Sequence, residues 1–223
     1  MHLLKANIEK IRNEIEETCR SCGRKPEEVV VVAVSKSQPV ALIEEAIKAG
    51  IKIFGENRVQ EAEKKIALLG HQIEWHLVGH LQSNKVKKAV RLFDVIHSVD
   101  SIKIARLLNQ TCKEENRAQL PIFIQVNISG EKTKSGVSEN DLEELVDFVR
   151  KCDKLKPIGL MTLPPFFEDA EKVRPFFRRL KFLRDKFLPN GGLSMGMSHD
   201  FHIAIQEGAT HVRIGTKIFG ERK

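Results

Sequence analysis

The residue with the clearest chemical potential is a lysine that follows a long apolar run. The run from Val29 to Val34 is continuously apolar and mostly β-branched, which is typical of a strand buried on both faces, and Ser35 and Lys36 come next. A lysine stem that rises from such a core is partly desolvated, and desolvation disfavours the ammonium form. Because a neutral amine attacks carbonyl carbons, Lys36 is a candidate for Schiff-base formation. A lysine that merely extends from a strand end into solvent is the alternative.

Two glycine-containing loops near the C-terminus have the composition of a phosphate site. They read Ser194-Met195-Gly196-Met197-Ser198 and Arg213-Ile214-Gly215-Thr216. Glycines let backbone N–H groups approach a phosphate, and Ser or Thr hydroxyls add donors, although such loops often form turns only. A reactive lysine together with a phosphate site is what pyridoxal 5′-phosphate requires. Arg213 could then face the pyridine nitrogen, where a cation keeps that nitrogen unprotonated and weakens the ring as an electron sink.

The elements that must position these residues alternate along the chain. We expect strands at 29–34, 51–54, 74–78, 94–98, 121–128, 156–162, 193–197 and 211–214. We expect helices near 39–48, 56–69, 83–91, 101–117, 139–152, 168–187 and 200–207, after a first helix with apolar residues at 4, 8, 11 and 15. Alternation of this kind implies a parallel sheet, and eight units in about 200 residues favour a closed barrel. The prediction is an α/β protein, a single (β/α)8 TIM barrel over residues 1–223 with an extra N-terminal helix.

The barrel explains where the reactive residues fall. In barrels of this type the functional groups lie beyond the C-terminal ends of the strands, and the loops after strands seven and eight often bind phosphate. Lys36 follows the first predicted strand, and the two glycine loops follow the last two. A doubly wound Rossmann-type sheet is the alternative, but its glycine-rich fingerprint is missing after the first strand.

The overall composition excludes several classes of protein. The 223 residues are 41% hydrophobic and 30% charged, as in ordinary globular proteins, and the net charge of +7 favours an anionic partner. The sequence has no apolar run long enough to cross a bilayer and no signal-peptide core, so we expect a cytoplasmic protein without a membrane partner. We also expect a monomer.

Other chemistry-bearing residues have simpler explanations. The pair Cys19 and Cys22 lacks the second pair that zinc requires, so no metal is predicted. His76 and His97 fall within predicted strands, where packing is the simpler role, and no histidine motif of a metalloprotease or hydrolase is present. The segment 174–187 mixes basic and aromatic residues, but its apolar residues follow helical spacing, so no nucleic-acid partner is predicted.

The sequence resembles the pyridoxal phosphate homeostasis proteins, whose barrel is related to the N-terminal domain of alanine racemases. The resemblance covers nearly the whole chain. The matching stretches begin with Ala33-Val34-Ser35-Lys36, Phe54-Gly55-Glu56-Asn57, Val59-Gln60-Glu61, Trp75-His76 and Gly79-His80-Leu81-Gln82-Ser83-Asn84-Lys85. They continue with Val126-Asn127, Ser129-Gly130-Glu131, Lys134-Ser135-Gly136, Gly159-Leu160-Met161, Leu193-Ser194-Met195-Gly196-Met197-Ser198 with Asp200, Val212-Arg213-Ile214-Gly215-Thr216 and Phe219-Gly220.

The resemblance implies a role for each of eight residues. Lys36 is expected to carry the cofactor as a covalent aldimine, and Arg213 to lie near the pyridine nitrogen. The phosphate is expected to contact Ser198, Gly215 and Thr216. Asn57, Met161 and Ser194 are expected to be neighbours of the ring. One departure is visible, because Arg58 stands where the family often has a tyrosine.

The sequence favours a binding protein over an enzyme. Racemisation generally needs a base on each face of the cofactor, and in the related alanine racemases the second base is a tyrosine from a second domain. This chain contains no tyrosine. We therefore expect a non-enzymatic protein of vitamin B6 homeostasis that holds and delivers pyridoxal phosphate, with pyridoxal phosphate-dependent apoenzymes as recipients. A low-activity racemase or transaminase, and a Schiff-base aldolase acting through Lys36, are the alternatives.

Overall fold

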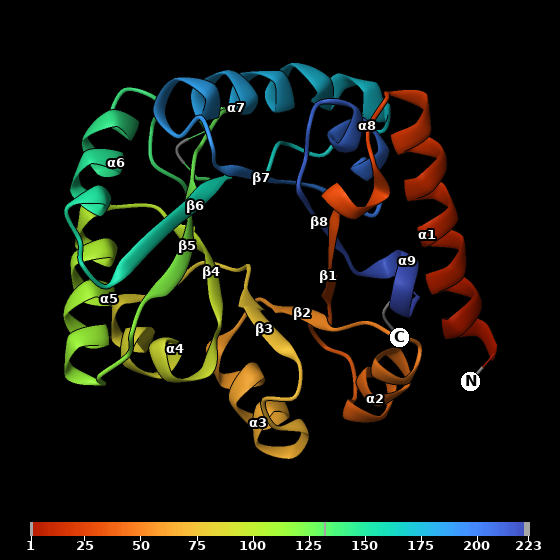
Figure 1. Ribbon diagram of the computed structural model, residues 1–223, viewed down its shortest axis with the longest axis horizontal. Helices are drawn as coiled ribbons and strands as arrows, with labels where there is room; N and C mark the ends of the chain where they lie inside the picture. Colours follow the sequence, from red (N-terminus) through yellow and green to blue (C-terminus); the bar gives the residue numbers. More distant parts are fainter. Residues whose placement is uncertain (1, 132, 221–223) are drawn as a thin grey trace.

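The computed structural model describes residues 2–131 and 133–220, and within them eight parallel strands close into a barrel in the order of the sequence (Figure 1). The strands are β1 (Val30–Val34), β2 (Ile53–Glu56), β3 (Glu74–Leu77), β4 (Val95–Val99), β5 (Leu120–Gln125), β6 (Leu155–Met161), β7 (Gly192–Met197) and β8 (His211–Ile214). The barrel closes because β1 pairs with β2 on one side and with β8 on the other. The predicted fold class is therefore confirmed.

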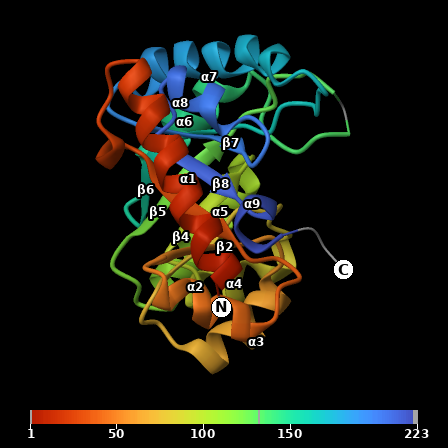
Figure 2. The ribbon, with the colours of Figure 1, turned by 90° about the vertical axis from the view of Figure 1, so that its right-hand side faces the viewer.

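Helices cover the outside of the barrel (Figure 1). They are α2 (Val40–Lys48), α3 (Val59–Leu69), α4 (Val86–Leu92), α5 (Ile102–Glu114), α6 (Leu142–Arg150), α7 (Arg174–Phe187) and α8 (Phe201–Gln206). The predicted N-terminal helix is α1 (His2–Ser21), which packs against α8 and the short α9 (Thr216–Phe219) (Figure 2). Its residues at 4, 8, 11 and 15 are buried, as their helical spacing predicts. No helix in the part of the chain that the structure describes is long and apolar enough to cross a membrane.

Several predicted boundaries are wrong by a few residues. The second strand runs over Ile53–Glu56 rather than 51–54, because Glu56 still pairs in register with Leu77. Helix α6 begins at Leu142 rather than near 139, since Ser138 and Asp141 bond to each other and close a turn before the helix. Helix α9 and the 3-10 turns Pro26–Glu28, Ser83–Lys85 and Ala170–Val173 are too short for periodicity to reveal them.

Helix α7 has the predicted two-sided character. Phe177, Leu180, Leu183 and Phe187 are buried, whereas Phe176 is only half-buried. The arginines of the helix are paired with acids of the same chain, as in the contacts of Arg178 with Glu207 and of Arg179 with Glu139. The arginines of this helix therefore have structural partners within the chain.

The inside of the barrel is unusually polar. Barrels of this kind are commonly filled by Val, Ile and Leu. Here Phe123 and Met161 pack with Val95 in an apolar cluster, but histidines, a serine and an arginine occupy much of the remaining interior. His97 on β4 contacts Ser194 on β7, two strands that are not neighbours, so their hydrogen bond crosses the interior.

Candidate functional site

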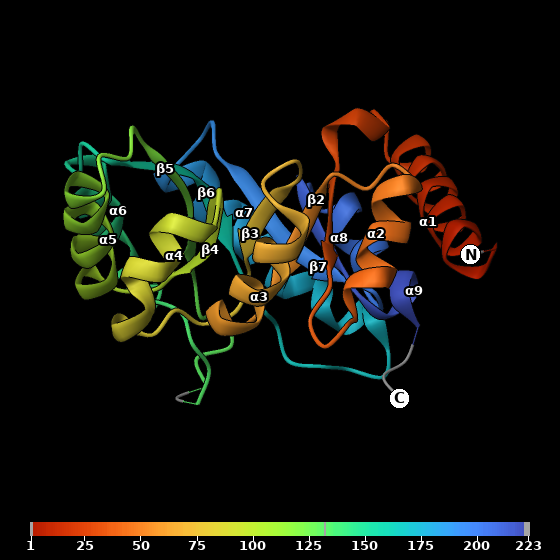
Figure 3. The same ribbon diagram turned by 90° about the horizontal axis from the view of Figure 1, so that it is seen from below.

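A cleft of about 490 Å³ opens at the C-terminal ends of the strands, within the size range of small-molecule sites. Figure 3 shows the loops after β5 and β6 extending at the same end of the molecule as α9. The cleft is lined by Val34, Lys36, Asn57, Val78, Lys134, Leu163, Pro164, Phe166, Met197, Ser198, His199, Arg213, Gly215 and Thr216. It therefore gathers residues from both ends of the sequence at one rim, as the barrel prediction requires.

Lys36 is presented by a tight turn that follows β1. The turn is closed by a hydrogen bond from the backbone N–H of Gln38 to the carbonyl oxygen of Ser35, 3.0 Å long. Ser37 adopts a left-handed conformation with φ of 62°, which is uncommon for a residue other than glycine. Such a conformation persists only where surrounding contacts hold it. Lys36 itself is half-buried in the cleft.

A buried lysine of α3 supplies those contacts. The Lys65 ammonium donates to the carbonyl oxygen of Ser35, to Oε1 of Glu56 and to Oε1 of Glu61, each at 2.7 Å. The same Glu61 oxygen accepts the backbone N–H of Ser37 at 2.5 Å. Residues on both sides of Lys36 are thus tied to α3, which fixes the direction in which the Lys36 side chain leaves the turn.

The two carboxyl groups of this network have pKa values shifted in opposite directions. Glu56 is fully buried, and desolvation raises its pKa even though Lys65 and the Ser35 hydroxyl donate to it. Desolvation also opposes ionisation of Glu61, but hydrogen bonds from Lys65 and from the Ser37 backbone outweigh it and lower the pKa of Glu61. The second oxygen of Glu56 has no hydrogen-bond partner among the described residues.

The two glycine loops are joined to each other by a serine hydroxyl. Ser198 Oγ accepts the backbone N–H of Gly215 at 3.2 Å and that of Lys217 at 3.4 Å, so the end of β7 is tied to the first turn of α9. Gly196 has a φ of +91°, and a Cβ there would lie 2.5 Å from the Cβ of Ala204. Only glycine fits this position, which lets the loop turn closely over α8.

Arg213 forms the floor of the cleft. Its guanidinium donates to Ser194 Oγ at 2.6 Å and to the carbonyl oxygen of Thr162 at 2.9 Å. Desolvation lowers the pKa of Arg213 to about 10, with the Asp200 carboxylate acting in the opposite direction. The Arg213 guanidinium therefore still carries its positive charge at neutral pH. It places this charge at the floor of a cleft whose rim supplies an amine and hydroxyl groups.

The structure brings six of the eight predicted site residues to this cleft. These six are Lys36, Asn57, Ser198, Arg213, Gly215 and Thr216. Met161 and Ser194 do not line it: Met161 is buried against Phe123 in the barrel interior, and Ser194 lies beneath, where it contacts Arg213.

Several residues of the site are missing from the predicted set. Phe166 and His199 lie on the rim with ring centroids 5.4 Å apart, and Lys134 is a second lysine of the cleft. No sequence pattern marks Phe166, which lies in a loop. Lys65 could have been found, because it falls on the same helical face as Ala62 and Leu69.

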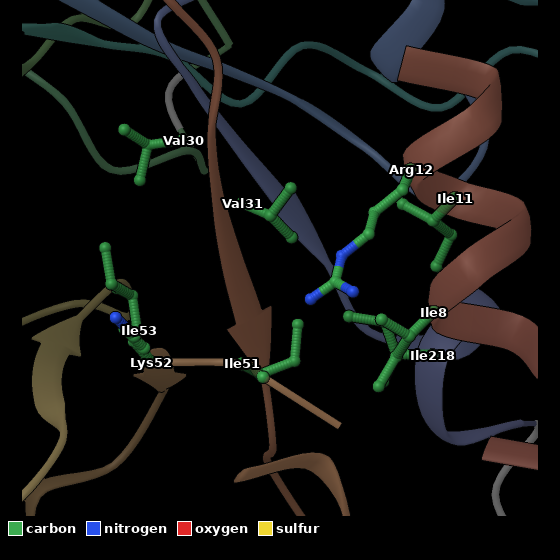
Figure 4. Close-up of a pocket in the computed structure, with 10 residues that line it drawn as sticks. Ile8, Ile11, Arg12, Val30, Val31, Ile51, Lys52, Ile53 and Ile218 are labelled. Carbon is green, nitrogen blue, oxygen red and sulfur yellow. The ribbon is translucent and has the colours of Figure 1, made fainter. Parts of the chain in front are cut away.

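A second cavity lies outside the barrel, beneath α1. It has a volume of about 270 Å³ and is lined mainly by isoleucines and valines of α1, β1 and the start of β2. Figure 4 shows the Arg12 side chain reaching into it from α1, and this guanidinium donates to the carbonyl oxygen of Ala49. Its apolar lining lacks the hydroxyl groups of the first cleft, so the cleft at the strand ends is the better candidate site.

Comparison with known proteins identifies the class to which this fold belongs. A family model described as "Alanine racemase, N-terminal domain" matches residues 4–223. An alanine racemase of Clostridium difficile, solved in complex with cycloserine, shares the fold at 16% identity with a TM-score of 0.75, over 100% of this chain and 60% of its own. The chain is thus a barrel of the alanine racemase N-terminal type.

Relatives with higher sequence identity define the family within this class. The pyridoxal phosphate homeostasis protein of Aquifex aeolicus is 43% identical over 224 residues, which is 97% of each chain. The protein of the same name in Escherichia coli K12 is 40% identical over 97% of this chain and 95% of its own. PipY of Synechococcus elongatus, solved with PLP bound, is 38% identical with a TM-score of 0.80 over 92% of this chain and all of PipY. The chain belongs to the family of pyridoxal phosphate homeostasis proteins.

Proposed function

We propose that this protein binds pyridoxal 5′-phosphate in the cleft at the strand ends, as a Schiff base on Lys36, and serves intracellular vitamin B6 homeostasis. The observation that carries the proposal is the convergence of Lys36 with Ser198, Gly215, Thr216 and Arg213 on one cleft. Relatives with about 40% identity over the full chain are named for pyridoxal phosphate homeostasis, and PipY was solved with the cofactor bound.

The donor set fits the chemical groups of the cofactor. A phosphate needs hydroxyl and backbone N–H donors, which the loop ends at Ser198 and Thr216 supply. An aldehyde needs an amine, which Lys36 supplies from the turn after β1. The Gly215 backbone lies beside the end of β1, because a Cβ there would be 3.3 Å from the carbonyl oxygen of Val34. Phosphate donors and the lysine turn are therefore adjacent.

Arg213 would determine the protonation of the pyridine nitrogen of the bound cofactor. When bound, the cofactor supplies an aldehyde and an electron-accepting ring. A buried guanidinium carries only donors, so at the pyridine nitrogen it keeps that nitrogen an acceptor and leaves the ring a weak electron sink. Asn57 would contact the ring from the β2 side. The Asn57 backbone packs directly against Gly79, where a Cβ would lie 2.2 Å from the Asn57 carbonyl oxygen, so only glycine at position 79 permits this placement of Asn57.

These features support binding and delivery rather than turnover. A weak electron sink stabilises a carbanion poorly, and the chain has no tyrosine to act as a second base. The cofactor would be held for release to pyridoxal phosphate-dependent apoenzymes. We further propose a monomer that acts in the cytoplasm. The fold shared with alanine racemases keeps a low-rate racemase or transaminase as the second candidate.

Visible absorption of the purified protein tests the proposal. Titration with pyridoxal phosphate is expected to give a yellow protein, and Lys36→Ala is expected to lose the Schiff-base absorption while retaining weak cofactor binding through Ser198 and Thr216. Lys134→Ala is the matched control, since Lys134 lines the same cleft and is expected to leave the absorption unchanged. A protein that stays colourless when saturated would contradict the proposal and favour the Schiff-base aldolase.

A further inference from the structure

A continuous line of hydrogen bonds crosses the barrel interior from the cleft floor to the opposite face. Arg213 donates to Ser194 Oγ at 2.6 Å, and Ser194 Oγ lies 2.8 Å from Nδ1 of His97. Nε2 of His97 lies 2.8 Å from Nδ1 of His76, and Nε2 of His76 lies 2.9 Å from the Glu74 carboxylate. Glu74 is the first residue of β3, so it marks the N-terminal face of the barrel, where its side chain is 45% exposed.

Elementary hydrogen-bond chemistry gives this line a direction. An ionised carboxylate only accepts, so Nε2 of His76 must donate to Glu74, and Nδ1 of a neutral His76 is then an acceptor. It follows that Nε2 of His97 donates to His76, and that Nδ1 of a neutral His97 accepts from the Ser194 hydroxyl. The lone pairs of Ser194 are thereby left to Arg213, which only donates.

The surroundings of the line favour a neutral imidazole at His97. His97 is fully buried, and desolvation lowers its pKa well below the usual range, with His76, His211 and Arg213 acting in the same direction. The hydrogen bond from His76 lowers the pKa of Glu74, which keeps that carboxylate ionised. A further imidazole, that of His211, lies beside the line, 6.0 Å from the His97 ring, and is hydrogen-bonded to Thr210 Oγ1 instead.

We propose that His97 and His76 are positioning residues for Arg213: the Glu74 carboxylate fixes both histidine tautomers, and these orient the Ser194 hydroxyl so that its lone pairs hold the guanidinium at the cleft floor. The importance of this position for cofactor binding rests on the proposed function, in which Arg213 faces the pyridine nitrogen. The direction of the hydrogen bonds does not depend on it.

Nitrogen NMR of the ¹⁵N-histidine-labelled protein without cofactor tests the direction. His97 and His76, assigned from single His→Gln variants, are both expected to show protonated Nε2 and unprotonated Nδ1. A protonated Nδ1 at His97 would reverse the bond to Ser194 and overturn the proposal. This measurement stands whether or not Lys36 binds pyridoxal phosphate.

Variants then test the positioning role through affinity for pyridoxal phosphate and the absorption maximum of the bound form. His97→Leu is expected to weaken affinity about fivefold, the effect of one misplaced hydrogen bond, and to shift the maximum. His97→Asn, which keeps an acceptor oxygen toward Ser194, is expected to restore both. His211→Leu removes a neighbouring imidazole outside the line and is expected to change neither. Equal effects of His97→Leu and His211→Leu would contradict the positioning role. If the unaltered protein does not bind pyridoxal phosphate, that result refutes the proposed function but not the direction of the hydrogen bonds.

Discussion

Replacement of Lys65 by methionine isolates the contact that holds the Lys36 turn. Methionine keeps most of the apolar stem but removes the ammonium that donates to Ser35, Glu56 and Glu61. The pair Lys65 and Glu56 has side chains that are 6% and 0% exposed, so water cannot replace the lost donor at Glu56 without rearrangement. The Lys65→Met variant therefore leaves a buried carboxyl group without its cationic partner.

The expected loss is about 3–5 kcal/mol in the free energy of unfolding at pH 7, the range for breaking one side of a buried ion pair. Desolvation already raises the pKa of Glu56, and loss of Lys65 removes a group that lowers it. A carboxyl whose pKa is higher in the folded than in the unfolded state costs stability above that pKa, and the cost disappears as the pH falls through it. Lys65→Met is therefore expected to be less destabilising at pH 5 than at pH 7.

Urea unfolding of a double-mutant cycle with Glu56→Gln measures the pair directly. Glu56→Gln removes the stranded charge, so the double variant is expected to be more stable than the sum of the single losses predicts, by about 1–3 kcal/mol. Lys88→Met is the matched control, since Lys88 makes a bond of the same 2.7 Å length to Glu63 at the surface, and should cost below about 1 kcal/mol. Additive losses in the cycle, or equal losses for Lys65→Met and Lys88→Met, would refute the reasoning.

Three further predictions concern the loops and the barrel interior. Gly196→Ala is expected to destabilise the protein by at least about 2 kcal/mol in urea unfolding, because a Cβ meets Ala204 at 2.5 Å, whereas Gly208→Ala, with a similar φ and no close contact, should cost about 1 kcal/mol. Ser198→Ala, which removes the acceptor for Gly215 and Lys217, is expected to weaken pyridoxal phosphate affinity about fivefold in a spectral titration, and unchanged affinity would contradict the phosphate assignment. Desolvation lowers the pKa of His211 to about 4, below the unfolded value near 6.5. Between these pH values the unfolded state binds a proton that the folded state does not, so the free energy of unfolding should fall by about 3 kcal/mol as the pH drops from about 6.5 to about 4. His211→Phe should reduce this pH dependence, measured as unfolding free energy at pH 7 and pH 4.5.

The barrel could be predicted from the sequence because short strand-like segments alternate with amphipathic helices, beginning with a first strand that is continuously apolar. The run from Val29 to Val34 and the helical spacing of Leu142, Leu145, Val146 and Val149 are local patterns that the structure confirms. Boundaries were less predictable where a charged residue ends a strand. Glu56 was expected beyond the second strand, at the start of the next helix. Lys65 compensates its charge inside the protein, and that partner is visible only once α3 is packed.

The site was predictable where the fold decides the position. Residues after β1, β7 and β8 must meet at one rim, which places Lys36, Ser198 and Thr216 together. The contribution of interior residues was not predictable, because it depends on contacts across the barrel. The histidines at 76 and 97 read as packing residues, and only the closed barrel brings His97 of β4 against Ser194 of β7.

The identity of the lysine that forms the Schiff base is the most direct test of the proposed function. The protein saturated with pyridoxal phosphate would be reduced with borohydride, digested, and mapped by peptide mass spectrometry. We predict a pyridoxyl group on Lys36, with Lys134 of the same cleft unmodified. A pyridoxyl group on Lys134 or another lysine, or no modified peptide at all, would contradict the account.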